Sequence, residues 1–485
     1  MSRPNILFIL SDDHAAHAMS CYGSKINRTP QLDRIAERGV RSDACYCTNS
    51  ICTPSRASIL TGQHAHTCDV RTLHDTLDNR HDPQLQRILK QHGYRTAMFG
   101  KWHLGHGEQE DGTNADPNGF DDWTVLPGQG DYYDPTFHTG THNGREAVRA
   151  GTLHTEGYVT DLITDMSLRW LDRWQADHGG DAPFFMCVHH KAPHRSWEPG
   201  PQEKDLFAGE TMPEPETLWD DYAGRPAAAA ARMRIDRDLL PHDVKATPPT
   251  GLSNRDRKLW YYDRYIKDYL RCVAGIDRNV GRLLDRLDEM GVSDDTIVVY
   301  CSDQGFFLGD HGWYDKRFIY EESFRMPLLV SYPREIAGGS RTQAMLTNVD
   351  FAPTLLDYAG IEPPPQMQGV SARGVLRGDT PADWQESVYY RYWMDRDFAH
   401  RTTSHYGVRT RRHKLIYFYA EPLDARGAGM VDTGIEPYWE LFDLEKDPYE
   451  MHNIYGQSGT QEITAELKAE LDRLQRHFDD TPRHA

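Results

Sequence analysis

The sequence predicts a doubly wound α/β fold, in which helices flank a mostly parallel sheet and a smaller C-terminal α+β subdomain follows. Two observations predict the main sheet. Short apolar runs without alternating polar residues are typical of strands that are buried on both faces, and helical patterns separate these runs. A third observation, a set of β-rich segments near the C-terminus, predicts an antiparallel sheet.

Four apolar runs supply the predicted strands of the main sheet. They are Ile6–Leu10, Thr96–Phe99, Phe184–Val188 and Thr296–Tyr300. Each run leads into a cluster of polar residues. Because ligands of doubly wound sheets bind beyond the carboxyl ends of the strands, these four clusters predict one composite active site.

Helical patterns and two long loops separate the predicted strands. The predicted helices are Pro30–Gly39, Asp82–Gly93 and Arg255–Gly291. The predicted loops are Gly105–Thr155, which is rich in Gly, Asp, His and Thr, and Trp197–Thr250, which is rich in Pro and Ala. Loops of this length often cover a pocket and determine specificity, so we expect both to border the site.

A boundary near Gly369–Trp384 predicts two domains, a catalytic α/β domain at residues 1–380 and a C-terminal α+β subdomain at residues 381–485 that contributes to the substrate cleft. The predicted antiparallel strands of the subdomain are Val388–Trp393, Tyr406–Thr410, Lys414–Tyr419 and Trp439–Leu444. A helix near Gln461–Phe478 closes the chain.

The composition is that of a globular protein with an acidic exterior. The chain has 485 residues, 26% of them charged and 38% hydrophobic, and a formal net charge of −19. This charge argues against nucleic acid or an anionic membrane as the main partner. It leaves anionic small molecules possible, because cations in a cleft override the net charge locally. The oligomeric state is not predicted.

Cysteine usage and the N-terminal residues predict a cytoplasmic protein. The eight cysteines show no zinc-type spacing and do not resemble a disulfide scaffold, which favours a reducing compartment. The apolar run near the N-terminus is too short for a signal peptide or a membrane span.

Polar residues with oxygen ligands follow two of the predicted strands. Asp12 and Asp13 come after the first strand, and Asp303 and Gln304 come after the fourth. Asp12 and Asp13 alone are equally consistent with a helix cap or a solvated turn. Together with Asp303 and Gln304 they form an oxygen-only set suited to Ca²⁺, with Mg²⁺ or Mn²⁺ as alternatives. Three converging carboxylates without a cation would be costly.

Cys52 begins a predicted helix that Pro54 opens and Gly62 ends. A cysteine at a helix N-terminus lies where the helix dipole favours anions, and we expect a lowered thiol pKa. Arg56 falls one turn along, close enough to hold an oxyanion. The alternative is a small buried cysteine that caps a core helix.

Four motifs in chain order resemble the signatures of the type I sulfatases, a family within the alkaline phosphatase superfamily. They are Cys52-Thr53-Pro54-Ser55-Arg56 with Leu60-Thr61-Gly62, Gly100-Lys101-Trp102-His103, Lys191-Ala192-Pro193-His194, and Asp303-Gln304-Gly305 through Lys316. With the C-terminal Trp439–Leu444 segment, the resemblance covers nearly the whole chain.

The resemblance implies a mechanism for hydrolysis of sulfate monoesters. Cys52 is oxidised to formylglycine by a separate formylglycine-generating enzyme, and the hydrate attacks sulfur near the cation held by Asp12, Asp13, Asp303 and Gln304. The remaining implied roles are protonation of the leaving oxygen by His194, neutralisation of the sulfate oxygens by Lys101 and Lys316, and orientation of the formylglycine by Arg56 and His103. Gln304 departs from the commonest pattern, in which this ligand is Asn or His.

The Ser302-Asp303-Gln304-Gly305-Phe306 form is similar to bacterial N-acetylglucosamine-6-sulfatases, which implies a sulfated sugar as substrate. We expect four further residues to contact the sugar: Lys191, His311, His405 and Arg409. A structural role is the alternative for His311, and a solvated strand face for His405 and Arg409. The His64-Ala65-His66-Thr67-Cys68 run could ligate zinc but favours a structural role, since no second cluster accompanies it.

Two other functions stay open. A phosphonate or phosphodiester hydrolase would use the same scaffold, because the site also suits a tetrahedral phosphoryl centre. An inactive, metal-dependent glycan-binding protein is the alternative from another class, and the complete set of candidate catalytic residues argues against it.

Overall fold

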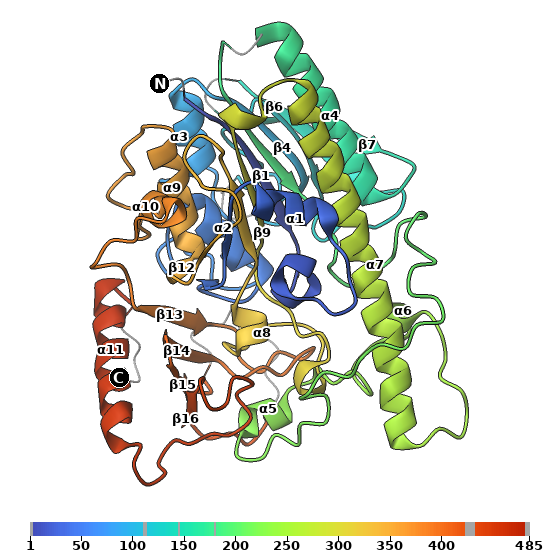
Figure 1. The fold of residues 1–485 in the computed structure, drawn as a ribbon, viewed down its shortest axis with the longest axis vertical. Helices are drawn as coiled ribbons and strands as arrows, with labels where there is room; N and C mark the ends of the chain where they lie inside the picture. Colours follow the sequence, from blue (N-terminus) through green and yellow to red (C-terminus); the bar gives the residue numbers. More distant parts are fainter. Residues whose placement is uncertain (1–2, 110–113, 144–145, 179–180, 422–431, 481–485) are drawn as a thin grey trace.

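The computed structural model describes residues 3–109, 114–143, 146–178, 181–421 and 432–480, and it shows one large sheet with a second, smaller sheet below it (Figure 1). The large sheet has ten strands in the order β11-β2-β10-β9-β1-β8-β4-β5-β6-β7. Their bounds are Ser340–Thr342, Val40–Ser42, Leu328–Ser331, Thr296–Ser302, Asn5–Ser11, Phe184–His189, Arg95–Lys101, Asp122–Leu126, Thr136–His142 and Ala147–His154. A two-stranded sheet pairs β3 (Cys45–Tyr46) with β12 (Leu346–Thr347).

The four predicted strands are confirmed as β1, β4, β8 and β9, and they are parallel neighbours at the centre of the sheet. The register pairs Ser11 with Ser302 and Leu10 with His189. The strands therefore end at the same level, and the polar residues that follow them lie together.

Helices cover both faces of the large sheet, which confirms the doubly wound fold. On one face lie α1 (Pro30–Glu37), α4 (Val159–His178) and α7 (Asn254–Glu289), packed on Leu7 and Ile9 of β1. On the other face lie α2 (Cys52–Thr61), α3 (Leu85–Gln91), α9 (Phe351–Tyr358) and α10 (Arg373–Arg377), packed on Ile6, Phe8 and Leu10. Alternate residues of one buried strand thus serve two hydrophobic cores.

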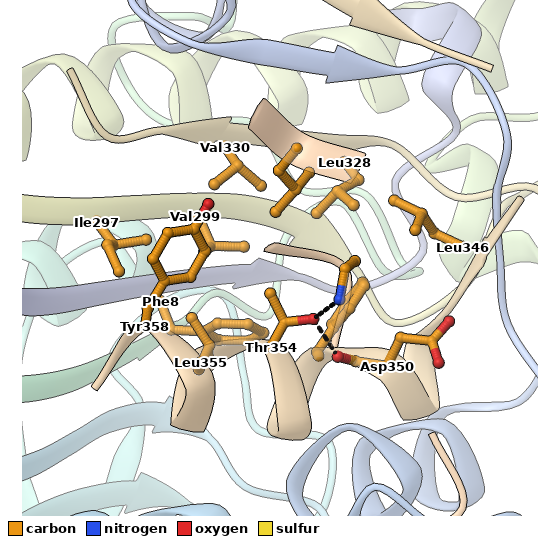
Figure 2. Close-up of a pocket in the computed structure, with 13 residues that line it drawn as sticks. Phe8, Ile297, Val299, Leu328, Val330, Leu346, Asp350, Thr354, Leu355 and Tyr358 are labelled. Carbon is orange, nitrogen blue, oxygen red and sulfur yellow. Dashed lines mark hydrogen bonds between the residues drawn. The ribbon is translucent and has the colours of Figure 1, made fainter. Parts of the chain in front are cut away.

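The core on the α9 face is mainly apolar, with the polar Thr354 and Asp350 beside its cavity (Figure 2). Phe8, Val299 and Leu328 from the sheet face Leu355 and Tyr358 of α9, around a residual cavity of about 30 Å³. This volume is about that of one water molecule. The cavity therefore belongs to the packing of the core and is not a ligand site.

The predicted loop at Gly105–Thr155 is wrong in part, because it contains β5, β6 and β7. These strands extend the sheet beyond β4, with β6 antiparallel to both of its neighbours. Helix α4 was not predicted either. The stretch at Trp197–Thr250 is irregular apart from the short helices α5 (Pro226–Ala230) and α6 (Pro241–Val244), as predicted.

The C-terminal antiparallel sheet and its helix are confirmed. The strands are β13 (Ser387–Tyr392), β14 (His405–Thr410), β15 (His413–Phe418) and β16 (Tyr438–Asp443), in that order, and α11 (Gln461–His477) packs on one face. The other face joins the core of the α/β part, near the short α8 (Glu321–Phe324). The domain boundary at residue 380 stays a prediction.

All eight cysteines are free thiols. Within the part of the chain that the structure describes, every helix is too short or too polar to cross a membrane.

Candidate active site

Three carboxylates and one amide meet at the carboxyl ends of β1 and β9. Asp12 and Asp13 follow β1, Asp303 and Gln304 follow β9, and all four side chains are buried. The backbone N–H of Asp13 donates to Oδ1 of Asp303 at 3.1 Å. One oxygen from each of the three carboxylates lies within 4.8 Å of the others. The structure therefore brings together the residues that the sequence predicts as metal ligands.

The electrostatics of this cluster fit a bound cation. Burial and the neighbouring Asp12 raise the pKa of Asp303 to about 8. Burial also raises the pKa of Asp13 to about 6, although Lys316 opposes the shift. A divalent cation would relieve this repulsion, because it favours the charged form of each carboxylate.

Gln304 supplies a second indication. Its amide nitrogen donates to Asp13, while its buried Oε1 has no hydrogen-bond partner within the described ranges. Unsatisfied buried oxygens are costly, and a hard cation accepts such a ligand. Gln304, which replaces the more common Asn or His, thus still supplies an oxygen that can bind a cation.

Three cations surround the carboxylates. Lys101 forms an ion pair with Asp12, and Lys316 Nζ lies 2.6 Å from both oxygens of Asp13. Arg56 Nε donates to Asp303 Oδ2 at 2.9 Å, and its Nη1 donates to the carbonyl of Lys101 at 2.8 Å.

These cations set the ionisation of the site. Burial alone would raise the pKa of Asp12, but Lys101 and other cations outweigh it and hold this pKa well below its ordinary value. Burial likewise opposes the charge on Lys316, and Asp13 raises the pKa of Lys316 above its ordinary value. Lys316 is therefore available as a charged group for the oxygens of an anionic substrate, and Lys101 is a second donor beside the carboxylates.

Cys52 is the first residue of α2, as predicted, and its thiol faces the carboxylates. Its Sγ lies 3.4 Å from Asp12 Oδ1 and 3.8 Å from Gln304 Nε2. Gly62 ends the helix in the left-handed conformation, with φ of 65°. Every residue of α2 is buried, and Cys52 itself is 1% exposed.

The expected lowering of the thiol pKa is wrong. Burial and Asp12 raise the pKa of Cys52 to about 12. A helix N-terminus contributes up to about 2 kcal/mol in favourable geometries, which does not offset the loss of hydration and an adjacent carboxylate. The thiol is therefore neutral and a poor nucleophile at physiological pH.

Two histidines lie at the edge of the cluster. His194 Nε2 is 3.7 Å from Asp13 Oδ2, and its Nδ1 lies 2.7 Å from the carbonyl of Arg195. A carbonyl only accepts hydrogen bonds, so Nδ1 carries the proton and neutral His194 presents a bare Nε2 to the site. His103 Nδ1 lies 3.4 Å from the hydroxyl of Thr53. Burial holds the pKa of both imidazoles well below the ordinary value.

Lys191 is the one predicted sugar-binding residue that the structure places beside this cluster. Burial and the nearby Lys101 lower the pKa of Lys191 to about 8. Its Nζ lies over the ring of Tyr132, 4.9 Å from the centroid.

The other three predicted sugar contacts are not supported, because their side chains are committed to interior contacts. His405 is fully buried, with Nδ1 facing the carbonyl of Thr403 at 2.8 Å and Nε2 accepting from the N–H of Ile319 at 3.2 Å. His311 is fully buried, 2.7 Å from Asp220. Arg409 pairs with Glu321 and lies over Tyr46.

The structure adds residues that the sequence analysis missed. The amide oxygen of Gln129 accepts a hydrogen bond from Lys101, and Tyr132 donates to the carbonyl of His194 at 2.5 Å. Both residues follow β5 in the stretch that was predicted as a loop. The available signal was the Gly128-Gln129-Gly130 sequence, whose glycines have φ of 54° and 66°.

His64 and His66 hold the C-terminal end of α11, which agrees with the structural role. The His64 ring packs on Phe478 with centroids 4.1 Å apart. His66 Nε2 lies 2.6 Å from the carbonyl of Phe478.

Two family models match the chain. One described as Sulfatase matches residues 4–361, and one described as N-sulphoglucosamine sulphohydrolase, C-terminal, matches residues 309–477. The chain is also 39% identical to the N-acetylglucosamine-6-O-sulfatase of Bacteroides thetaiotaomicron, in an alignment that covers 99% of this chain and 87% of that protein.

Two solved structures extend the comparison. BT4656 in complex with its substrate D-glucosamine-2-N,6-O-disulfate has a TM-score of 0.86 and 38% identity, and 99% of each chain is covered. A phosphonate monoester hydrolase of Agrobacterium radiobacter has a TM-score of 0.73 and 19% identity, and 98% of this chain and 96% of that one are covered. The second likeness shows a shared fold alone.

Proposed function

Because this chain belongs to the sulfatase family and hydrolyses sulfate esters, we propose that its substrate is a glucosamine unit that carries a sulfate group on O6. The observation that carries the proposal is the similarity, over nearly the whole chain, to an N-acetylglucosamine-6-O-sulfatase. The substrate of BT4656, D-glucosamine-2-N,6-O-disulfate, carries the same 6-O-sulfated glucosamine.

Sulfatases generally use a metal ion and a formylglycine. In our proposal Asp12, Asp13, Asp303 and Gln304 hold Ca²⁺, and the orphan oxygen of Gln304 supports this donor set. A bound divalent cation polarises the sulfate and lowers the pKa of an attacking hydroxyl.

The environment of Cys52 supports a role as precursor of the nucleophile. Its raised thiol pKa leaves little thiolate, so a formylglycine would supply an oxygen nucleophile that the thiol does not. Arg56 fixes this end of α2 through Asp303 and the carbonyl of Lys101. We also propose that a formylglycine-generating enzyme converts Cys52. A reducing compartment, which suits the eight free thiols of the chain, is the proposed location of the protein.

The remaining residues bind the sulfate and move a proton. Lys101 and Lys316 would donate to the sulfate oxygens, where their charge offsets the charge that develops in the transition state. His194 would carry a proton on Nε2 to the leaving sugar oxygen. Its pKa is low in the free site, so this role requires the negative charge of the bound sulfate to favour the imidazolium.

The proposal is tested with defined sulfated sugars. Release of sulfate is measured from 6-O-sulfated N-acetylglucosamine, 2-N,6-O-disulfated glucosamine, a 3-O-sulfated isomer and an aryl phosphonate ester, with Cys52→Ala as the control. We expect the two 6-O-sulfated sugars to give the highest kcat/KM. Faster turnover of the 3-O-sulfated isomer or of the phosphonate ester would contradict the proposed substrate.

A further inference from the structure

A pocket of about 470 Å³ lies outside the cluster of catalytic residues, between the end of α5 and the loop that precedes β14. Its polar lining is mainly cationic. The charged residues of the lining are Arg232, Arg234, Arg237 and Arg401, with Asp238 and Asp432. Four guanidinium groups therefore face two carboxylates, in a chain whose net charge is −19.

These arginines have few internal counter-ions. Arg232, with 40% of its side chain exposed, has Asp238 at 3.8 Å. Arg234 donates to the carbonyl of Ala229 and lies over the ring of Tyr222. Across the described residues no carboxylate lies within 4.0 Å of the guanidinium groups of Arg234, Arg237 or Arg401. Clustered cations without partners repel one another, and an external anion would remove this cost.

Hydrogen bonds join the pocket to the catalytic loop, the segment at residues 303–316 that carries Asp303 and Lys316. The N–H of Ile235 donates to the carbonyl of Gly312 at 3.1 Å, and the N–H of Tyr314 donates to the carbonyl of Met233 at 2.9 Å. Arg234 is thereby paired with Trp313, three residues before Lys316. The Cα atoms of a bridged pair lie close together, and three residues of chain have a limited reach. The Cα atoms of Arg234 and Lys316 are therefore at most about 16 Å apart.

The segment that carries the lining residue Arg401 is also tied to this loop. The N–H of Arg232 donates to the carbonyl of His400 at 2.7 Å, and His400 Nε2 lies 3.3 Å from Asp315 Oδ2. Asp315 directly precedes Lys316, which binds Asp13. Phe398, two residues before His400, leaves 72% of its side chain exposed, with the Arg232 guanidinium 6.0 Å from its ring centroid.

We propose that this arginine pocket binds a second sulfate group, carried by a neighbouring sugar of a sulfated oligosaccharide whose 6-O-sulfate occupies the active site. The proposal rests on the proposed function and deepens it. Guanidinium forks match the paired oxygens of a tetrahedral anion, so several arginines around one pocket suit a sulfate ester better than a neutral sugar. Phe398, exposed beside Arg232, offers an apolar face to a sugar ring.

The test separates binding in the pocket from catalysis. Arg237→Gln/Arg401→Gln is chosen because the side chains of these two arginines make no hydrogen bond within the described ranges. The matched control is Arg169→Gln, on the exposed face of α4. Each enzyme is assayed on 6-O-sulfated N-acetylglucosamine and on an oligosaccharide that carries this sugar next to a second sulfated one.

We expect the double variant to raise KM for the oligosaccharide about tenfold or more, because one charge-assisted hydrogen bond is worth at least that factor. Its kcat, and both constants for the monosaccharide, stay at the values of the wild type. The effect shrinks as salt is added, since the pocket is open to solvent. Equal losses on both substrates, or no change on either, would overturn the proposal.

A binding measurement distinguishes failure of this proposal from failure of the proposed function. Titration of the oligosaccharide into Cys52→Ala, with and without the two arginine substitutions, reports the pocket without turnover. Weaker binding only in the arginine variant supports the pocket even if the wild type hydrolyses another sulfate ester. Equal affinities, or tighter binding of a short single-stranded nucleic acid than of the oligosaccharide, would overturn it.

Discussion

Replacement of Glu440 by Gln should stabilise the protein above neutral pH. Glu440 is fully buried in β16 and accepts hydrogen bonds from the hydroxyls of Tyr320 and Tyr438, each at 2.7 Å. Burial raises the pKa of this carboxyl from 4.5 to about 7, although both hydroxyls oppose the shift. The native state therefore binds the proton more tightly than the unfolded state.

The difference in the pKa of Glu440 between the native and the unfolded state determines how stability changes with pH. A raised native pKa gives stability that is fully present below about pH 4.5 and is lost as pH rises to about 7. The shift corresponds to about 3 kcal/mol. With an unfolding entropy of about 2.1 cal/mol/K per residue, this free energy is roughly 3 °C in Tm for a chain of this length. A glutamine removes the titration and accepts from one tyrosine hydroxyl through Oε1, while its Nε2 donates to the other hydroxyl, which turns to accept.

Thermal unfolding of the wild type and of Glu440→Gln is followed between pH 5 and 8.5, with Glu466→Gln on the exposed face of α11 as the control. The Tm of Glu440→Gln should rise relative to the wild type as pH increases, and then level off above about pH 7. The control difference should stay flat. A constant difference for Glu440→Gln, or a relative gain by the wild type at high pH, would refute the reasoning.

Four further predictions concern the active site. Cys52→Ala should abolish sulfate release while leaving Tm nearly unchanged, and wild-type turnover in this variant would remove the precursor assignment. Removal of the metal by a chelator should lower both activity and Tm. Addition of Ca²⁺ at 100 times its Kd should then raise the free energy of unfolding by about 2.7 kcal/mol. The Tm of Asp303→Asn should rise less on addition of Ca²⁺ than the Tm of the wild type. A wild-type Tm that does not change on chelation would exclude the metal site. His194→Ala should lower kcat about 10²–10⁴-fold on a sugar sulfate but far less on nitrophenyl sulfate, whose leaving oxygen needs no proton. Similar losses on both substrates would contradict the role of His194 as the acid.

The central strands and the residues that follow them could be predicted, because a strand buried on both faces is apolar at every position. β1 and β9 have this pattern, and it located Asp12 and Asp303 before any contact was known. β6 lacks it, since its Thr-Phe-His-Thr-Gly-Thr-His sequence is mostly polar and only tertiary packing makes it a strand. The apolar spacing of α4 was available in the sequence and was missed.

The contacts across the two sheets could not be predicted. His405 lies on an antiparallel strand, where alternation separates two faces but does not tell which face another layer covers. Here Phe318, two residues after Lys316, packs on His405 and helps to bury it. In the same way, the raised pKa of Cys52 depends on Asp12, which is 40 residues away in the chain.

The burial of α2 has a consequence for the order of events during synthesis. Cys52 and the rest of α2 are buried in the folded chain. If Cys52 is oxidised by a separate enzyme, that enzyme needs the segment while it is still extended. Conversion then competes with folding, and a slow oxidation step would leave a stable but permanently inactive fraction. The yield of active protein would depend on how quickly the nascent chain closes over residues 52–61.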